Sequence, residues 1–326
     1  MADTDLLAIE DLAVHFPVGG GMFSQPQMLR AVDGVSLRIR PGESLGLVGE
    51  SGCGKSTLAL SILGLVDPTR GRVVVDGTAV GTDTDRLAVA RTVQMVFQDP
   101  YASLNPRQTV RRTLAAPLRL HGITNSGEVA DRVAEMLRQV GLRPDQADLY
   151  PHEFSGGQRQ RIGIARALIL KPKLVICDEP VSALDVSIRA QIINLLLELQ
   201  AEMGLSYLMI SHDLGVVEHM SDKVAVMYLG RIVETGGWRE IFERPRHPYT
   251  RALIAAIPDP LTRALGREKA HGEVPSPLNP PPGCTFNPRC PHAIDKCRAS
   301  PPVLSPIEEG HLVSCWRAEE LSTVRA

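Results

Sequence analysis

The stretch Gly46-Leu-Val-Gly-Glu-Ser-Gly-Cys-Gly-Lys-Ser-Thr57 decides the fold of this chain. Within it, Gly49, Gly54, Lys55 and Ser56 have the spacing G-x-x-x-x-G-K-[ST] of a P-loop. The glycines let the backbone turn tightly and aim N–H groups at phosphate oxygens. The lysine reaches the β- and γ-phosphates, and the hydroxyl that follows it binds Mg²⁺. The sequence therefore predicts a nucleoside triphosphate site.

The residues on either side of the loop support this interpretation. Residues 44–48 are mostly apolar, as in a buried strand, and residues 56–65 have the pattern of a helix. Such a helix presents its positive N-terminal end to a bound anion. A glycine-rich turn that matches by chance is the alternative, and the strand before it and the helix after it argue against that alternative.

The composition sets limits on the class of protein. The chain has 326 residues, of which 44% are hydrophobic and 22% charged, with a formal net charge of −2. This balance is ordinary for a globular protein and does not point to a nucleic-acid partner. No apolar run is long enough to span a bilayer, and the first residues lack the pattern of a signal peptide. We expect a cytosolic protein that reaches any membrane through partners.

Hydrophobic periodicity predicts an α/β core with an antiparallel sheet and a helical insertion added to it. Alternating apolar residues predict strands at 6–16 and 31–39, joined by a glycine-rich surface loop at 17–27. Further strands are expected at 71–76 and 93–97, and most of an antiparallel sheet is expected on the N-terminal side of the nucleotide core. Helical spacing at 109–120 and 127–140, with Gly141 as a helix C-cap, predicts a helical insertion within about residues 100–160.

Strands and helices then alternate, which favours a mostly parallel sheet. The expected elements are a helix at 158–170, a strand at 173–177, a helix at 186–203, a strand at 206–210 and a hairpin at 224–234. After about residue 257 the chain becomes proline-rich and irregular, with too little apolar content for a core of its own. This segment needs a cross-link, such as a metal site or a disulfide, to fold.

Two further motifs carry chemistry. The apolar run at 173–177 ends in Asp178 and Glu179, where the first carboxylate can hold Mg²⁺ and the second can act as general base. Residues 154–158, Phe-Ser-Gly-Gly-Gln, precede a helix and form a second anion site. An acidic turn and an ordinary helix N-cap are the structural alternatives.

The ordered set of motifs resembles the ATP-binding subunit of an ABC transporter from about residue 6 to residue 240. Residues 154–158 are similar to the signature motif, with Phe154 in place of its first leucine. The other similarities are Asp178 and Glu179 to Walker B, Gln98 to the Q-loop, Ser182–Asp185 to the D-loop, His212 to the switch histidine and Phe16 to the aromatic residue that stacks on adenine. Another P-loop ATPase is the alternative.

The resemblance implies a fold and a set of roles. The fold is a P-loop ABC cassette with a RecA-like core, an antiparallel β subdomain and a helical subdomain, over residues 1–256, followed by a small irregular extension at 257–326. Glu179, His212, Lys55 and Gln98 are the expected catalytic residues, and Ser56, Gln98 and Asp178 the expected Mg²⁺ ligands. The expected nucleotide-binding residues are Phe16, Gly49, Glu50, Ser51, Gly52, Cys53, Gly54, Lys55, Ser56, Thr57, Gln98, Asp178, Ser155, Gly156, Gly157, Gln158 and Asp185. Of these, Ser155, Gly157 and Gln158 are expected to act in trans on the nucleotide of a partner subunit.

The resemblance narrows to the ATPases of oligopeptide and dipeptide importers, and among these to the second ATPase subunit. It is carried by residues 97–106, 178–187, 247–253 and 275–290. It implies a second ATPase subunit, two permease subunits, an extracytoplasmic binding protein and a place on the cytoplasmic face of the membrane. Import of nickel or glutathione, a soluble ABC ATPase and an iron–sulfur protein with ATP as a switch are the competing functions.

Four of the six cysteines, Cys284, Cys290, Cys297 and Cys315, lie within 32 residues. Such a cluster in a reducing compartment binds metal more often than it forms disulfides. Four thiolates can hold a [4Fe–4S] cluster or a zinc ion, and the spacing lacks the C-x2-C pairs common in zinc ribbons. Some importer ATPases carry such a cluster in this extension, so we expect a structural [4Fe–4S] cluster, with zinc, a disulfide and free thiols as alternatives.

Overall fold

The structure is a computed structural model that describes residues 5–20, 26–81, 85–256, 270 and 272–323. The chain divides into two compact units, each made of separate stretches of sequence. The first comprises residues 1–7, 39–44 and 74–210, and the second comprises residues 8–38, 45–73 and 211–326. The expected domain boundary after residue 256 adjoins residues 257–269, which lie outside the described residues, and it stays a prediction.

The second unit is built on strands that meet the P-loop strand. Strand β3 (Ser44–Val48) is buried along its whole length and pairs in parallel with β9 (Lys223–Tyr228). The hairpin partner of β9 is β10 (Arg231–Gly237), as the sequence predicted. Leu229 and Gly230 join them with φ of 43° and 78°, the left-handed pair that a tight hairpin requires.

The C-terminal extension adds two strands that the sequence analysis described as irregular. Strand β12 (His311–Val313) pairs antiparallel with β10, and β11 (Ser305–Glu308) pairs with β12. The irregular assignment was therefore wrong for these residues. The strands are three and four residues long, and one contains Pro306. Strand β12 therefore becomes ordered by pairing with β10, whose paired residues lie 77 and 79 positions earlier, and β11 by pairing with β12, rather than by a local pattern.

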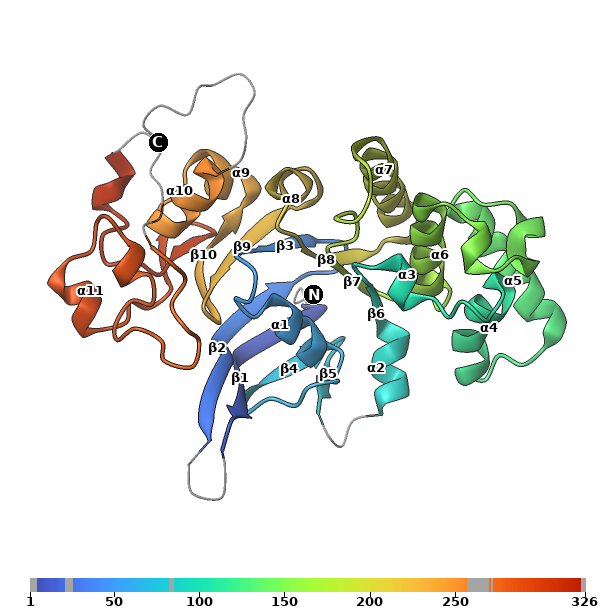
Figure 1. Ribbon diagram of the computed structural model, residues 1–326, viewed down its shortest axis with the longest axis horizontal. Helices are drawn as coiled ribbons and strands as arrows, with labels where there is room; N and C mark the ends of the chain where they lie inside the picture. The colour runs from blue at the N-terminus through green and yellow to red at the C-terminus, as the bar shows by residue number, and fades with distance from the viewer. Residues whose placement is uncertain (1–4, 21–25, 82–84, 257–269, 271, 324–326) are drawn as a thin grey trace. The chain divides into compact units, whose positions relative to one another are not determined.

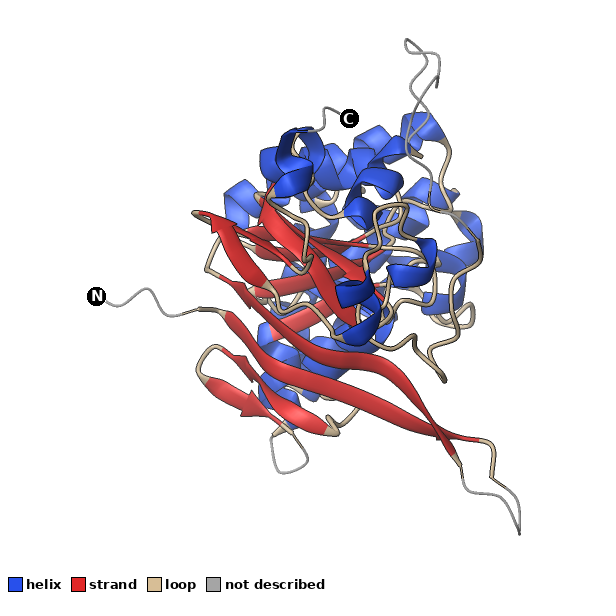
Figure 2. Cartoon of the chain, turned by 90° about the vertical axis from the view of Figure 1, so that its left-hand side faces the viewer, coloured by secondary structure: helices blue, strands red, loops and turns tan. Residues whose placement is uncertain are grey.

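A second sheet contains the long strands β1 (Leu7–Val18) and β2 (Gln27–Ile39), drawn in red in Figure 2. Strand β1 lies between β2 and β4 (Arg70–Val75). Leu12, Val32 and Val73 are fully buried on these strands. Both predicted N-terminal strands are confirmed and extend into the predicted loop at 17–27, of which residues 21–25 lie outside the described residues.

The first unit contains a parallel sheet in the order β8, β7, β6. These strands are Ser206–Ile210, Leu174–Asp178 and Val93–Val96. Helix α7 (Val186–Met203) has the predicted bounds. Strand β5 (Thr78–Val80) and helix α2 (Arg86–Thr92) were not predicted, and both are short.

The predicted helical insertion is present in the first unit. Helices α4 (Val110–Leu120), α5 (Ser126–Gln139) and α6 (Gly156–Leu168) pack on one another, as Figure 1 shows. Gly141 follows α5 with φ of 74°, as expected of a residue that ends a helix. The remaining helices are α1 (Lys55–Ile62), α3 (Pro100–Ser103), α8 (Leu214–Met220), α9 (Trp238–Glu243), α10 (Pro248–Ala255) and α11 (Asp295–Ala299), with 3-10 turns at Pro144–Asp148, Pro151–Glu153, Asn287–Arg289 and Glu320–Thr323. None of the helices in the described ranges is long and apolar enough to cross a membrane.

Candidate nucleotide site and cysteine cavity

The P-loop connects β3 to α1 in the second unit, as predicted. Gly49 and Gly54 have φ of 154° and 110°, a region that L side chains rarely adopt. A Cβ at Gly49 would overlap the carbonyl oxygen of Met227, and a Cβ at Gly54 would overlap that of Ala31. Backbone from two other strands therefore encloses the loop and leaves no space for a side chain at either glycine.

The ammonium of Lys55 lies inside the loop. Its Nζ donates to the carbonyl oxygens of Gly49 at 2.8 Å and Glu50 at 3.1 Å, and the side chain is buried. Cys53 Sγ lies 3.6 Å from the same Nζ, and burial raises the pKa of this thiol. A phosphate oxygen in the loop would offer Lys55 a charged acceptor in place of these neutral ones.

Glu50 is engaged by two residues that the sequence analysis did not assign to the site. Its backbone N–H donates to Tyr249 Oη at 2.8 Å. Its carboxylate receives Arg289 Nη1 and Nη2 at 2.8 and 3.0 Å, and this bonding raises the pKa of Arg289 above its usual value. Arg289 directly precedes Cys290, but the pairing spans 239 positions and no local pattern reveals it.

In the first unit, the Q-loop and Walker B residues meet. Gln98 Nε2 donates to Glu179 Oε2 at 2.7 Å. Glu179 has φ of 49°, and such left-handed non-glycine residues occur where the surrounding structure holds them. Its N–H donates to Ile210 O at 2.8 Å, and its C=O accepts from Ser182 Oγ at 3.1 Å. Asp178 precedes it as the last residue of β7.

The signature residues begin α6. Ser155 Oγ accepts from the Gln158 N–H at 3.3 Å, and Gln158 Oε1 accepts from the Ser155 N–H at 3.0 Å, which is a capping box. Gly156 and Gly157 occupy the first two helical positions, whose N–H groups have no intrahelical acceptor. A Cβ at Gly157 would lie 2.7 Å from Ile188 Cγ2, so glycine is also required for packing on α7.

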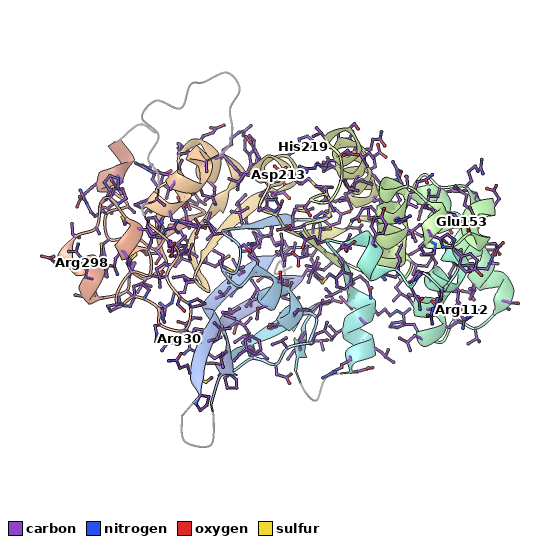
Figure 3. All side chains as sticks on the ribbon, in the orientation of Figure 1. Arg30, Arg112, Glu153, Asp213, His219 and Arg298 are labelled. Carbon is purple, nitrogen blue, oxygen red and sulfur yellow. The ribbon has the colours of Figure 1, made fainter. Side chains whose placement is uncertain are left out.

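The other predicted site residues lie at the starts of helices, on β1 and in the P-loop. His212 is exposed before α8, and the N–H of Ser211 donates to Leu47 O of the P-loop strand at 3.4 Å. Asp213, labelled in Figure 3, caps α8. Phe16 is half-buried on β1, and Asp185 is the N-cap of α7. Ser51, Gly52 and Ser56 are exposed and Thr57 is half-buried.

The four C-terminal cysteines line one small cavity, together with His247, His292 and Trp316. The backbone N–H of Arg317 donates to Cys315 Sγ at 3.4 Å, and burial raises the pKa of Cys315 to about 12. Among the described residues, no group of three or more His, Cys, Asp or Glu side chains is arranged to hold a metal ion. The cysteines thus share a cavity, and the metal remains a prediction.

The chemistry of the cavity fits a thiolate-held metal group. His247 Nδ1 accepts the N–H of Tyr249 at 3.0 Å, which places the ring proton on Nε2. Burial lowers the pKa of His247 to about 4, so the ring is neutral. Its Nε2 is buried without a hydrogen-bond partner in the described structure and belongs to a residue that lines the cavity. Four thiols and an unused N–H donor suit a group that carries negative charge on sulfur.

Comparisons with known proteins agree with the motifs. Residues 32–182 match the family described as ABC transporter, and residues 233–297 match the family described as oligopeptide/dipeptide transporter, C-terminal region. The chain is 54% identical to the oligopeptide transport ATP-binding protein OppF of Salmonella typhimurium, over 97% of both chains. It is 49% identical to the dipeptide transport ATP-binding protein DppF of Haemophilus influenzae, over 97% of this chain and 98% of that one.

Solved structures show the same fold. The ATP-binding cassette MJ0796, solved as a dimer in a post-hydrolysis state bound to ADP and Pi, superposes with a TM-score of 0.62 at 28% identity. The match covers 72% of this chain and 99% of that chain. The predicted ABC cassette fold is therefore confirmed.

Proposed function

The chain belongs to the family of oligopeptide and dipeptide transport ATP-binding proteins, and we propose that it hydrolyses ATP to power the import of peptides across a membrane. The observation that carries this proposal is the 54% identity over 97% of both chains, together with the match of its C-terminal region. Every catalytic motif of the cassette is present in this chain. The chain therefore supplies the ATPase activity of such an importer.

The catalytic residues have distinct roles in the proposed hydrolysis. Lys55 and the P-loop N–H groups bind the β- and γ-phosphates. Glu179 accepts a proton from water as the water oxygen bonds to the γ-phosphorus, the bond to the β–γ bridging oxygen breaks, and ADP and phosphate leave. Gln98 orients Glu179, to which it donates at 2.7 Å, and His212 contacts the γ-phosphate. Ser56, Gln98 and Asp178 offer the hard oxygen donors that would hold Mg²⁺, which would neutralise charge on the phosphates when bound.

A second ATPase subunit completes each site in this proposal. The N–H groups of Gly156 and Gly157 at the start of α6 suit a phosphate that belongs to the partner subunit. Asp185 would act in the same interface. The dimeric form of the MJ0796 cassette with ADP and Pi supports such a pair. We infer a heterodimer with a sister ATPase, so the isolated chain should hydrolyse ATP slowly.

The remaining partners follow from the importer family. They are two permease subunits, with an extracytoplasmic binding protein that delivers the peptide, and the chain would sit on the cytoplasmic face of the membrane. The region around the helical insertion would receive the permeases. Phe97 and Tyr101 lie there, 43% and 65% exposed, and suit an apolar contact with a partner.

Reconstitution tests the proposed function. The chain is expressed with its permeases and sister ATPase, and the complex is placed in vesicles with the binding protein. We expect peptide uptake that requires MgATP, with the Glu179→Gln complex as the inactive control. Uptake of nickel or glutathione without peptide, or purification of the chain without any permease, would contradict the proposal.

We also propose that Cys284, Cys290, Cys297 and Cys315 hold a [4Fe–4S] cluster with a structural role. The shared cavity and the N–H donor to Cys315 Sγ support this assignment. Such a cluster would be the cross-link for a segment that lacks a large core.

Metal analysis of the purified chain distinguishes the alternatives. We expect a brown protein that absorbs near 400 nm with about four irons per chain, and loss of both signals in Cys297→Ser. Cys177→Ala is the matched control, because Cys177 is fully buried in β7 and does not line the cavity. A colourless protein with one tightly bound zinc would contradict the cluster.

A further inference from the structure

The segment from Cys284 to Cys290 contacts the P-loop through the side chain of Arg289. Arg289 forms a two-pronged ion pair with Glu50, at 2.8 and 3.0 Å, and its side chain is only 8% exposed. Both carboxylate oxygens of Glu50 are bound in this way. A planar guanidinium that donates to both oxygens fixes the orientation of a carboxylate as well as its position.

Glu50 in turn contacts the catalytic lysine. Its N–H donates to Tyr249 Oη at 2.8 Å, and its carbonyl oxygen accepts from Lys55 Nζ at 3.1 Å. The side chain, the N–H and the C=O of this one residue are therefore all engaged within the second unit. A path of direct contacts runs from Arg289 through Glu50 to Lys55.

An aromatic cluster, defined as Tyr228, Tyr249 and Phe286, supports this path. Phe286 is 1% exposed and packs edge-on against Tyr228, with ring centroids 5.3 Å apart, and its centroid lies 5.4 Å from that of Tyr249. Arg289 Nη1 also lies 3.4 Å from Tyr228 Oη. Tyr228 directly follows Met227, whose carbonyl oxygen closes the space beside Gly49.

The segment that carries Phe286 and Arg289 is itself held by backbone hydrogen bonds, one of which joins it to Cys297. The N–H of Cys284 donates to Cys297 O at 2.8 Å, and the N–H of Asn287 donates to Cys284 O at 2.9 Å. The N–H of Arg289 donates to Phe286 O at 3.0 Å, within a 3-10 turn. Arg289 thus leaves a short, hydrogen-bonded turn between two cysteines of the cavity.

We propose that Arg289 and Tyr249 are positioning residues of the nucleotide site, which hold Glu50 so that its carboxylate stays neutralised and away from Lys55. This inference rests on the proposed ATP binding at the P-loop. Without Arg289, the Glu50 carboxylate becomes an unpaired negative charge one residue from Gly49. It would then attract the Lys55 ammonium and repel the phosphates, so the extension sets the affinity of the P-loop for ATP.

Loss of the Arg289 side chain is expected to weaken the binding of MgATP rather than slow its hydrolysis. In the purified importer, Arg289→Ala should raise the KM for MgATP about 10-fold, with kcat changed less than twofold. Adding Glu50→Gln to Arg289→Ala removes the stray charge and should restore most of the affinity. A purely structural role of Arg289 would give no such rescue, because the second substitution would only add damage.

Two further variants and a control sharpen the test. Arg289→Lys keeps the positive charge but loses the bidentate hydrogen bonding to Glu50. Its KM for MgATP should therefore lie between those of wild type and Arg289→Ala. Tyr249→Phe removes only the acceptor of the Glu50 N–H and should raise KM about threefold, and it keeps the test decisive if Arg289→Ala fails to fold. Arg298→Ala is the control, because Arg298, labelled in Figure 3, lies on α11 in an exposed pair with Asp295 and should leave KM unchanged.

Unchanged KM in both Arg289→Ala and Tyr249→Phe, with wild-type melting temperature and metal content, would overturn the inference. Equal KM values for Arg289→Ala and its double variant with Glu50→Gln would overturn it too. Failure of the wild-type complex to bind a fluorescent ATP analogue would instead overturn the proposed function, and the inference with it.

Discussion

Replacement of Glu179 by glutamine is expected to lower the ATPase rate of the assembled importer by at least about 100-fold, because general bases contribute on this scale. The amide cannot accept a proton from water, yet it has nearly the shape of the carboxylate. Gln98 can still donate to the amide oxygen, so the contact at 2.7 Å has an equivalent in the variant. Binding of ATP should therefore persist.

The measurement is phosphate release by the purified complex at saturating MgATP, with affinity for a fluorescent ATP analogue as the companion. Glu153→Gln is the matched control. Glu153 lies near the signature, and its carboxylate accepts the N–H of Tyr150 at 2.6 Å, so the same chemical change is made outside the proposed catalytic set. A wild-type rate in Glu179→Gln would show that another group is the base.

Replacement of Gly54 by alanine is expected to abolish nucleotide binding at the P-loop. The new Cβ would overlap the carbonyl oxygen of Ala31, and φ at this position is 110°. Neither β2, which carries Ala31, nor the P-loop can move without displacing the loop N–H groups that would bind the phosphates. We expect at least a 10-fold loss of affinity for the ATP analogue, and a lower melting temperature since left-handed backbone costs about 1–2 kcal/mol for a residue with a Cβ.

Gly52→Ala separates the two causes. Gly52 also has positive φ, at 78°, but a Cβ there would meet no atom within 4 Å. It therefore carries the conformational cost without the overlap, and its loss of affinity should be smaller than that of Gly54→Ala. Equal losses in the two variants would mean that backbone conformation, rather than the overlap with Ala31, governs binding.

The sequence was informative where structure depends on neighbours along the chain. Strands β3 and β8 and helix α7 have the predicted bounds, because a buried strand and an amphipathic helix are determined by patterns of a few residues. The P-loop is also local, since its motif occupies the eight consecutive positions 49–56. The glycine at 141 marked the end of α5 for the same reason.

Contacts between residues far apart in the sequence leave no local pattern from which they can be predicted. The contact of Arg289 with Glu50 joins residues 239 positions apart, and β12 pairs with residues of β10 that lie 77 and 79 positions earlier. Tyr249 lies in the stretch 247–253 that resembles importer ATPases, but nothing nearby indicates that its hydroxyl meets the P-loop. The position of Arg289 beside Cys290 was the one available signal, and it points to the cysteines rather than to the nucleotide.

The pairing of β3 with β9 also has a consequence for how the chain folds during synthesis. Leu45 pairs with Lys223, so the strand that carries the P-loop waits for a partner 178 residues further along the chain. At roughly 5–20 residues per second, this delay is about 9–36 s. The apolar β3 remains without that partner throughout this interval, when a chaperone would have the greatest effect on yield. Slower translation between residues 45 and 223 should therefore increase aggregation of the nascent chain. Slower translation after residue 237, where the β9–β10 hairpin is complete, should increase it less.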